Sequence, residues 1–153
     1  MKKDFIHITD LSTQEILDFI DLAKEIKTKL LNKENYKPFE NCSLAMIFAK
    51  PSARTRVSFE TGFEWMGGHA LFLGPNDIGI GKREAIKDIS RVFSRYNDII
   101  MARLFDHKHI IELAEHSSIP IGGAFVKTTV WFPLKKCIAS IEPVHNLGPS
   151  SFY

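Results

Sequence analysis

The sequence has few of the features that place a protein in an oxidising compartment, in a membrane or on a nucleic acid. Its two cysteines, Cys42 and Cys137, form no metal-binding spacing, so a reducing, cytosolic setting suits them. No apolar run approaches the ~20 residues that cross a membrane, and the N-terminus enters domain-like sequence without the pattern of a signal or transit peptide. The net charge of +2 is too small to predict a nucleic-acid or membrane partner. We therefore expect a cytoplasmic protein without such partners.

What is present is the composition of an ordinary globular protein, with 44% hydrophobic and 25% charged residues. A chain of 153 residues is long enough for one core and has little room for two domains. Neither internal repeats nor low-complexity tracts interrupt it.

Short apolar runs alternate with helical patterns over the first 121 residues. The helical patterns cover 13–31, 52–66, 82–96 and 107–116. The apolar runs predict strands over 43–49, 69–73 and 98–102, and a fourth that begins at 119. This alternation predicts an α/β fold: a single three-layer domain with a mainly parallel, roughly four-stranded sheet flanked by helices.

Local signals mark the ends and faces of these helices. Ser12 followed by Glu15 is a capping box at the start of the first helix. Gly67 and Gly68 are a stop signal at the end of the second. The inner face of the third helix is expected to carry Ile86, Ile89, Phe93 and Tyr96.

The junction of the first strand and the second helix, residues 48–60, combines hydroxyl and arginine side chains. Backbone N–H groups in the first turn of a helix lack partners, and the helix dipole favours an anion there. Ser52 and Thr55 can add hydroxyl donors. Arg54 and Arg56 lie two residues apart and point to nearly opposite sides of a helix, so at most one can face a ligand at this turn. The pattern predicts an oxyanion site, and a plain helix cap with solvated arginines stays an open alternative.

The run Ser-Ala-Arg-Thr-Arg-Val-Ser-Phe-Glu at 52–60 closely resembles the Ser-x-Arg-Thr-Arg signature of the aspartate/ornithine carbamoyltransferase family. Further matches follow in order at 67–73, 81–84 and 94–103. Together they resemble the ornithine branch rather than the aspartate branch. The resemblance covers about residues 3–121, which corresponds to the family's N-terminal, carbamoyl-phosphate-binding half.

The resemblance implies transfer of the carbamoyl group from carbamoyl phosphate to ornithine, giving citrulline and phosphate, a step of arginine biosynthesis. It implies that Ser52, Ala53 (through its backbone), Arg54 and Thr55 bind the phosphate. Thr55 and Arg103 would contact the carbamoyl group, so the implied catalytic residues are Arg54, Thr55 and Arg103. The family needs no metal or organic cofactor, and its members are trimers with sites shared between subunits.

Two positions depart from the family pattern. Ala53 stands where many members have Thr or Met, and little harm is expected because that position contributes mainly backbone. Gly79 stands where many ornithine-type members have Gln, on a loop that reaches a neighbouring subunit's phosphate site. Lys82 and Arg83 are candidates for a replacement cation, and the alternative is a charged helix N-terminus facing water.

Simpler interpretations apply to other polar residues. Without the family, Arg103 reads as an exposed charge at a strand end. Asp98, ahead of an apolar run, is expected to cap a strand end rather than to act as an acid or base. His107 and His109 diverge on a helix, which favours a surface role over a metal site.

Beyond residue 121 both the periodicity and the resemblance stop. His145 is followed by Asn146, where the family's His-Pro-x-Gln motif has proline, so no family role is assigned to it. We hypothesise that 122–153 derives from a shifted reading frame or an aberrant splice and that the ornithine-binding half is absent. The hypothesis is wrong if no reading frame of the DNA beyond codon 121 encodes a His-Pro-x-Gln run.

Three other functions stay open at this point. One is a catalytically inactive fragment that binds carbamoyl phosphate or another subunit. Another is an aspartate-type transferase, because the amine substrate is chosen by the other half of the family's chain. The third is a generic phosphate or nucleic-acid binder, which the mild net charge argues against.

Overall fold

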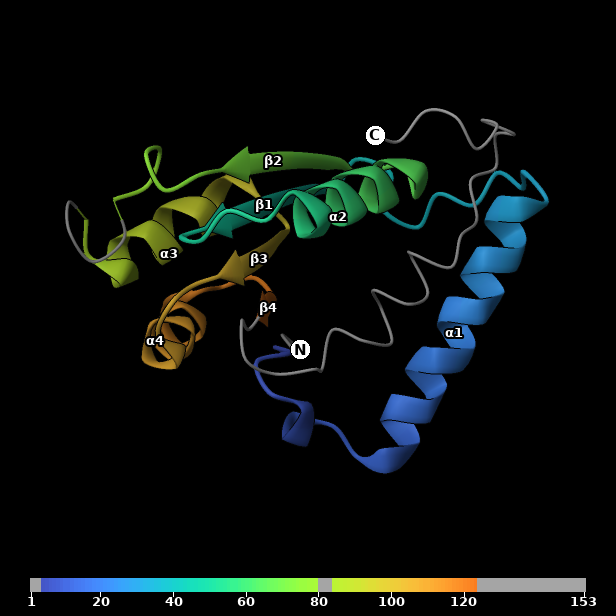
Figure 1. The fold of residues 1–153 in the computed structure, drawn as a ribbon, viewed down its shortest axis with the longest axis horizontal. Coiled ribbons are helices and arrows are strands. Elements are labelled where there is room, and N and C mark those ends of the chain that lie inside the picture. The colour runs from blue at the N-terminus through green and yellow to red at the C-terminus, as the bar shows by residue number, and fades with distance from the viewer. Residues whose placement is uncertain (1–3, 80–83, 124–153) are drawn as a thin grey trace, which may run out of the picture.

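The computed structural model describes residues 4–79 and 84–123 (Figure 1). Its helices are the 3-10 helix η1 (Ile8–Asp10) and the α-helices α1 (Thr13–Leu31), α2 (Ala53–Trp65), α3 (Ile86–Tyr96) and α4 (His107–His116). Its strands are β1 (Ser43–Phe48), β2 (His69–Leu73), β3 (Ile99–Arg103) and β4 (Ile121–Gly123). No helix in this described part is long and apolar enough to cross a membrane.

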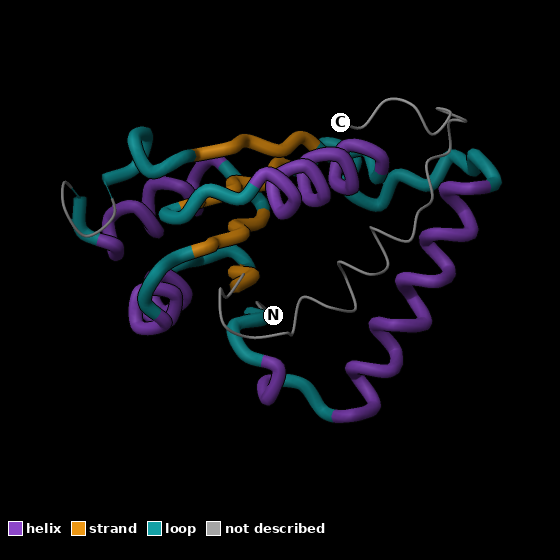
Figure 2. Tube along the Cα trace, in the orientation of Figure 1, coloured by secondary structure: helices purple, strands orange, loops and turns teal. Residues whose placement is uncertain are grey.

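The four strands form one parallel sheet in the order β2-β1-β3-β4 (Figure 2). Strand β1 is central, with Ser43 opposite His69 on β2 and Leu44 opposite Ile99 on β3. Helices connect the successive strands, as parallel pairing requires. The predicted α/β class and the number of strands are confirmed.

The central strand contributes alternate side chains to two separate apolar clusters, because successive residues of a strand point to opposite faces. Ala45 and Ile47 pack in a cluster with residues of α3 and α4. Leu44, Met46 and Phe48 pack in the other cluster with residues of α2. Helices therefore cover both faces of the sheet, and the predicted three layers are confirmed.

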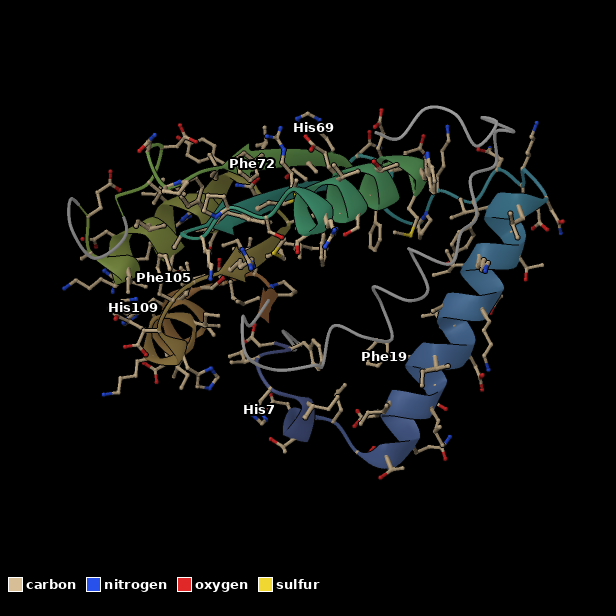
Figure 3. The ribbon with its side chains drawn as sticks, viewed as in Figure 1. His7, Phe19, His69, Phe72, Phe105 and His109 are labelled. Carbon is tan, nitrogen blue, oxygen red and sulfur yellow. The ribbon has the colours of Figure 1, made fainter. Side chains whose placement is uncertain are left out.

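Helix α1 begins as predicted but is not buried. Ser12 accepts from the Glu15 amide, and the Glu15 carboxylate accepts from the Ser12 amide. None of the residues of α1 is buried, and Phe19 on its surface is 50% exposed (Figure 3). Figure 1 shows the helix lying apart from the sheet. No other element in the described part of the chain buries the apolar stripe of α1.

The N-terminal segment lies along the outer edge of β4. The Phe5 amide donates to the Ile121 carbonyl at 2.8 Å, and the Gly123 amide donates to the Phe5 carbonyl at 2.8 Å. The Asp4 carboxylate accepts from the Ile121 amide at 2.8 Å. This edge of the sheet is thus partly paired, and β4 extends two residues past position 121.

Two expectations about the third helix are wrong. It begins at Ile86 rather than at residue 82, because Ala85, just before it, has an extended backbone with φ −70° and ψ 140°. Tyr96 is 79% exposed rather than on the inner face. Its carbonyl accepts from the Ser43 hydroxyl at the start of β1, so this last helical residue lies at the rim of the sheet.

Candidate functional site

The candidate site lies where β1 and β3 end side by side. Phe48, the last residue of β1, is paired with Arg103, the last residue of β3. The chain leaves β1 to form β2 on one side and later returns to form β3 on the other. In open α/β sheets such a reversal of strand order leaves a crevice at the carboxyl ends of the strands, where ligands bind.

Ser52 begins α2 without capping it. Its hydroxyl makes no bond to the helix backbone and instead donates to the Thr55 hydroxyl oxygen at 2.9 Å. The first helical hydrogen bond runs from the Arg56 amide to the Ser52 carbonyl at 2.9 Å. Within the described residues, the amides of Ala53, Arg54 and Thr55 therefore have no acceptor. The alternative of a plain serine cap does not fit this geometry, because the Ser52 side chain makes no capping bond to the helix backbone. The first-turn amides are of the kind that can bind an anion.

Thr55 is the buried member of this turn, with 7% of its surface exposed. Because its Oγ1 accepts from Ser52, its own hydroxyl proton remains for another acceptor. Hydrogen bonds in such a chain polarise one another. Thr55 is thus arranged to donate to an oxygen atom held at the N-terminus of α2.

The two arginines of the turn have different surroundings. Arg56 donates to the Glu60 carboxylate at 3.0 Å, and its guanidinium lies 4.1 Å from the centroid of the Phe72 ring on β2. Arg54 is exposed and has no carboxylate partner among the described residues. Of the pair, Arg54 is the one left for a ligand at this turn, in agreement with their predicted divergence.

Arg103 is packed against the same turn rather than extended into solvent. Its Nη1 donates to the carbonyls of Lys50 and Pro51 at 2.6 and 2.9 Å. Its own carbonyl accepts from the Ala49 amide at 2.9 Å. Arg103 therefore joins the end of β3 to the segment that leads into Ser52. Arg103 does lie at a strand end, but it is half-buried and hydrogen-bonded there rather than the exposed charge that the residues alone predict.

The other predicted site residues lie as follows. Gly79 is half-buried, and its carbonyl accepts from the Glu84 amide at 3.5 Å. Lys82 and Arg83 lie outside the described residues, so their role as replacement cations stays a prediction.

Away from the site, Asp98 acts as a cap at the opposite end of the sheet. Its carboxylate accepts from the Ser43 amide at 2.7 Å and from the Ser43 hydroxyl at 3.0 Å, which confirms the predicted strand-end cap. Over 4–79 and 84–123, His, Cys, Asp and Glu side chains form no group of three that could hold a metal ion.

Sequence reasoning missed the partners of the arginines. Nothing in the local pattern marks the Lys50 and Pro51 carbonyls as acceptors for a residue more than 50 positions away. Likewise Phe72 was assigned only as a strand residue. The one available signal was the position of Arg103 at a strand end, which predicts nearness to the site but not these contacts.

Comparisons with known proteins identify the family of this chain. Residues 3–129 match the family model described as aspartate/ornithine carbamoyltransferase, carbamoyl-P binding domain. The chloroplastic ornithine carbamoyltransferase of Pisum sativum is 58% identical over 120 residues, which cover 78% of this chain and 32% of the relative. The ornithine carbamoyltransferase of Anoxybacillus flavithermus is 50% identical over 119 residues, 78% of this chain and 38% of the relative.

Solved structures give the same result. Ornithine carbamoyltransferase from Pyrococcus furiosus superposes with a TM-score of 0.78 at 40% identity, covering 80% of this chain and 39% of that one. The catalytic subunit of aspartate transcarbamoylase from M. jannaschii superposes with a TM-score of 0.75 at 34% identity, covering 80% of this chain and 42% of that one. The chain spans 32% to 40% of the length of the curated relatives that it matches. Because residues 3–129 match the family model and the fold superposes on solved carbamoyltransferases, the chain belongs to the aspartate/ornithine carbamoyltransferase family and carries its carbamoyl-phosphate-binding domain.

Proposed function

We propose that this chain is the carbamoyl-phosphate-binding part of an ornithine carbamoyltransferase. The whole enzyme would transfer the carbamoyl group of carbamoyl phosphate to L-ornithine and release citrulline and phosphate, as in arginine biosynthesis. The observation that carries the proposal is the uncapped N-terminus of α2 beside Arg103 at the carboxyl end of the sheet. The names of the relatives that are 58% and 50% identical support the ornithine type.

The reaction is attack by an amine on the carbonyl carbon of carbamoyl phosphate, with phosphate as the leaving group. Its rate depends on donors aimed at the phosphate and at the carbonyl oxygen, where negative charge develops. In this proposal the phosphate is bound by the first turn of α2, through Ser52, Ala53, Arg54 and Thr55. Thr55 and Arg103 act on the carbamoyl oxygen. The proposal includes no metal or organic cofactor.

The number of donors is sufficient for binding. Micromolar affinity corresponds to about 8 kcal/mol. A hydrogen bond to a charged group contributes roughly 1.5–3 kcal/mol net. Arg54, the Thr55 hydroxyl and the three free amides of the turn would together contribute roughly 7.5–15 kcal/mol. This range reaches the value for micromolar binding, and its upper part can offset some of the entropic cost of association.

The first experiment is calorimetric titration of the chain with carbamoyl phosphate, comparing Arg54→Ala with Arg56→Ala. Both variants lose one positive charge from the same helix. We expect Arg54→Ala to weaken binding at least about tenfold. Arg56→Ala should stay within about threefold, because its guanidinium is engaged by Glu60 and Phe72. Equal losses in the two variants would contradict the assignment of Arg54 to the phosphate.

A second candidate function is a catalytically inactive fragment that binds carbamoyl phosphate or another subunit. The observation in its favour is that the chain spans only 32% to 40% of the length of its curated relatives. Citrulline formation from carbamoyl phosphate and ornithine separates the two proposals. Turnover that is abolished in Arg54→Ala excludes the inactive fragment, whereas binding without turnover supports it.

Assembly, location and division of the chain complete the proposal. We place it in a cytoplasmic homotrimer in which the loop with Gly79, Lys82 and Arg83 reaches a neighbouring subunit's phosphate. The sequence predicts residues 1–121 as the carbamoyl-phosphate domain and 122–153 as a tail of aberrant origin. Because β4 reaches Gly123 and the family match reaches residue 129, we propose that the domain extends past 121 and that only residues beyond it have an aberrant origin. The DNA beyond codon 121 tests the origin of the tail, and sedimentation equilibrium tests the trimer.

A further inference from the structure

One side of α1 carries residues at the spacing of a helix–helix contact. In alternating steps of four and three positions, this side presents Glu15, Phe19, Leu22, Ile26 and Lys29. We call these five residues the α1 seam. Phe19 is 50% exposed and Leu22 is 44% exposed, and Figure 1 shows the helix lying apart from the sheet. The described part of the chain therefore leaves the middle of the seam accessible.

The charges of α1 are divided between its two halves. Acidic side chains lie in the first half and mostly basic ones in the second: Glu15, Asp18 and Asp21, then Lys24, Glu25, Lys27 and Lys29. Two such helices attract each other side by side when they run in opposite directions, and parallel alignment places like charges opposite each other. The same division is also favoured by the dipole of a single helix. The positions of the charges on the seam are therefore needed to identify a partner.

The α1 seam is symmetric about Leu22. Glu15 precedes Leu22 by seven positions, and Lys29 follows it by seven. A twofold axis through Leu22 therefore places Glu15 of one copy opposite Lys29 of the other, at both ends of the contact. Between these ends Phe19 packs near Ile26 of the other copy. The seam is thus complementary to itself, as a twofold contact between identical chains requires.

Contacts within the chain already order the two charged ends of the seam. The Glu15 carboxylate accepts from the Ser12 amide and hydroxyl at 2.8 and 2.9 Å. The Lys29 ammonium lies 2.6 Å from the Glu25 carboxylate and 4.4 Å from the centroid of the Tyr36 ring. A carboxylate has about four acceptor positions and an ammonium has three donors, so each can take a further partner. Because both side chains are already held, pairing them costs less conformational entropy.

We propose that two copies of this chain associate through the α1 seam as an antiparallel, twofold-symmetric pair of helices. The occupant is a second copy because the seam matches itself in both apolar spacing and charge. From Glu15 to Lys29 the seam is about 21 Å long, so the association is weak and depends on concentration. It uses α1 alone and does not depend on carbamoyl phosphate. Where trimers form, this contact joins one trimer to another.

Cysteine cross-linking of the full chain tests the position of the twofold axis. In a chain with Cys42→Ser and Cys137→Ser, Leu22→Cys places two thiols side by side at the axis. Leu17→Cys is the matched control, because Leu17 is 50% exposed but lies about 140° around the helix from Leu22. Under mild oxidation Leu22→Cys should give several-fold more covalent dimer than Leu17→Cys. Equal yields in the two variants would overturn the proposal.

Charge reversal tests the direction of the helices. Glu15→Lys and Lys29→Glu each place like charges opposite each other at both ends of an antiparallel pair. Each should raise the dissociation constant, measured by sedimentation equilibrium, about tenfold. An equimolar mixture of the two variants should restore the original value, because opposite charges then face each other again. A parallel pair predicts no loss in either variant, since like charges already face each other in the original chain.

Each outcome decides for or against the pair. Losses in the single variants with recovery in the mixture support it, and no loss, or loss without recovery, overturns it. If Glu15→Lys unfolds α1 through loss of the capping box, which circular dichroism shows, the cross-linking yields decide. An original chain that forms neither dimers nor species heavier than a trimer also overturns the proposal and assigns the seam to another segment or another protein. Binding of carbamoyl phosphate is unaffected by any of these results, so the two proposals fail independently.

Discussion

Arg54 and Arg56 have the same side chain and lie two positions apart, yet within the described part of the chain only Arg56 has its guanidinium held by other side chains. Arg56 combines an ion pair to Glu60, with a contact of 3.0 Å, and a stacked position over Phe72, 4.1 Å from the ring centroid. Contacts of these kinds contribute about 0.3–0.5 and 0.5–1 kcal/mol at exposed sites. The direction of each residue around α2, rather than its type, separates a structural arginine from one available to a ligand.

Thr55 permits a prediction at the scale of one hydroxyl group. Thr55→Val keeps the branched shape but removes the oxygen that accepts from Ser52. Affinity for carbamoyl phosphate should fall about tenfold, because one polarised donor to the ligand is lost. Calorimetric titration measures the change.

Thr55→Ser is the control, because it keeps the hydroxyl and loses a methyl group. It should bind carbamoyl phosphate within about threefold of the original chain. If the valine variant binds as tightly as the serine variant, the hydroxyl of Thr55 takes no part in binding.

At the scale of the element, the two ends of α2 are built in opposite ways. The N-terminus is open, whereas the C-terminus is closed by two glycines. Gly67 has a φ of +90°, and the Gly68 amide donates to the Phe63 carbonyl at 2.9 Å. These bonds satisfy carbonyls that a helix end leaves free. The C-terminal end of α2 is thus held by backbone hydrogen bonds, whereas the amides of its first turn lack an acceptor among the described residues.

Gly68→Ala should destabilise this connection strongly. A Cβ at Gly68 would overlap the ring of Phe63, which is buried and stacked on Phe39 with ring centroids 4.7 Å apart. The ring cannot move without loosening the α2 face of the core. We expect a loss of about 1–3 kcal/mol in the free energy of unfolding, measured by denaturant titration.

Gly122→Ala provides the matched glycine control. A Cβ there would meet only the Ile100 carbonyl, at 4.0 Å, so its effect should stay within about 0.5 kcal/mol. Equal losses in the two alanine variants would show that backbone freedom, not the overlap with Phe63, decides the cost.

For the whole molecule, exposed large apolar side chains of the described residues lie on α1 and also on other elements, among them Val57 on α2 and Leu71 on the edge strand β2. The outer edge of β4 is partly covered, because the segment with Phe5 pairs along it. On α1, Leu17 and Phe19 are each 50% exposed and Leu22 is 44% exposed. Phe19 and Leu22, three residues apart, share one face of α1, whereas Leu17 points to nearly the opposite side. Exposed apolar surface such as that of Phe19 and Leu22 promotes association.

We therefore expect the chain to form species heavier than a trimer as its concentration rises, which sedimentation velocity can measure. Phe19→Lys should shift their appearance to a concentration about tenfold higher, because a charge in that surface must be desolvated on contact. A cooperative, monomeric melt of the original chain would contradict the expectation.

Gln14→Lys is the control for the added charge. Gln14 is exposed near the start of α1, and its side chain donates to Asp18 at 2.8 Å on the polar side of the helix. This variant should associate like the original chain. If both variants lower association equally, net charge rather than the apolar surface of α1 controls it.

Features with local causes were determined by the sequence itself. The capping box at Ser12, the paired glycines after α2 and the apolar run of β1 each act within a few residues, so the elements could be predicted nearly to their ends. The ordered motifs determined the family. The prediction that Tyr96 lies on the inner face of α3 was wrong. Tyr96 continues the apolar spacing of the helix, but it lies beyond the part of the helix that is buried against the sheet.

The tertiary structure alone decided which residues surround the first turn of α2. The order β2-β1-β3-β4 places the end of β3 beside the end of β1, and so brings Arg103 to carbonyls 53 and 52 positions earlier. The same order places Phe72 beneath Arg56. These contacts depend on which strands pair, and strand pairing follows from burial of the two faces of the sheet together rather than from any short stretch of the chain.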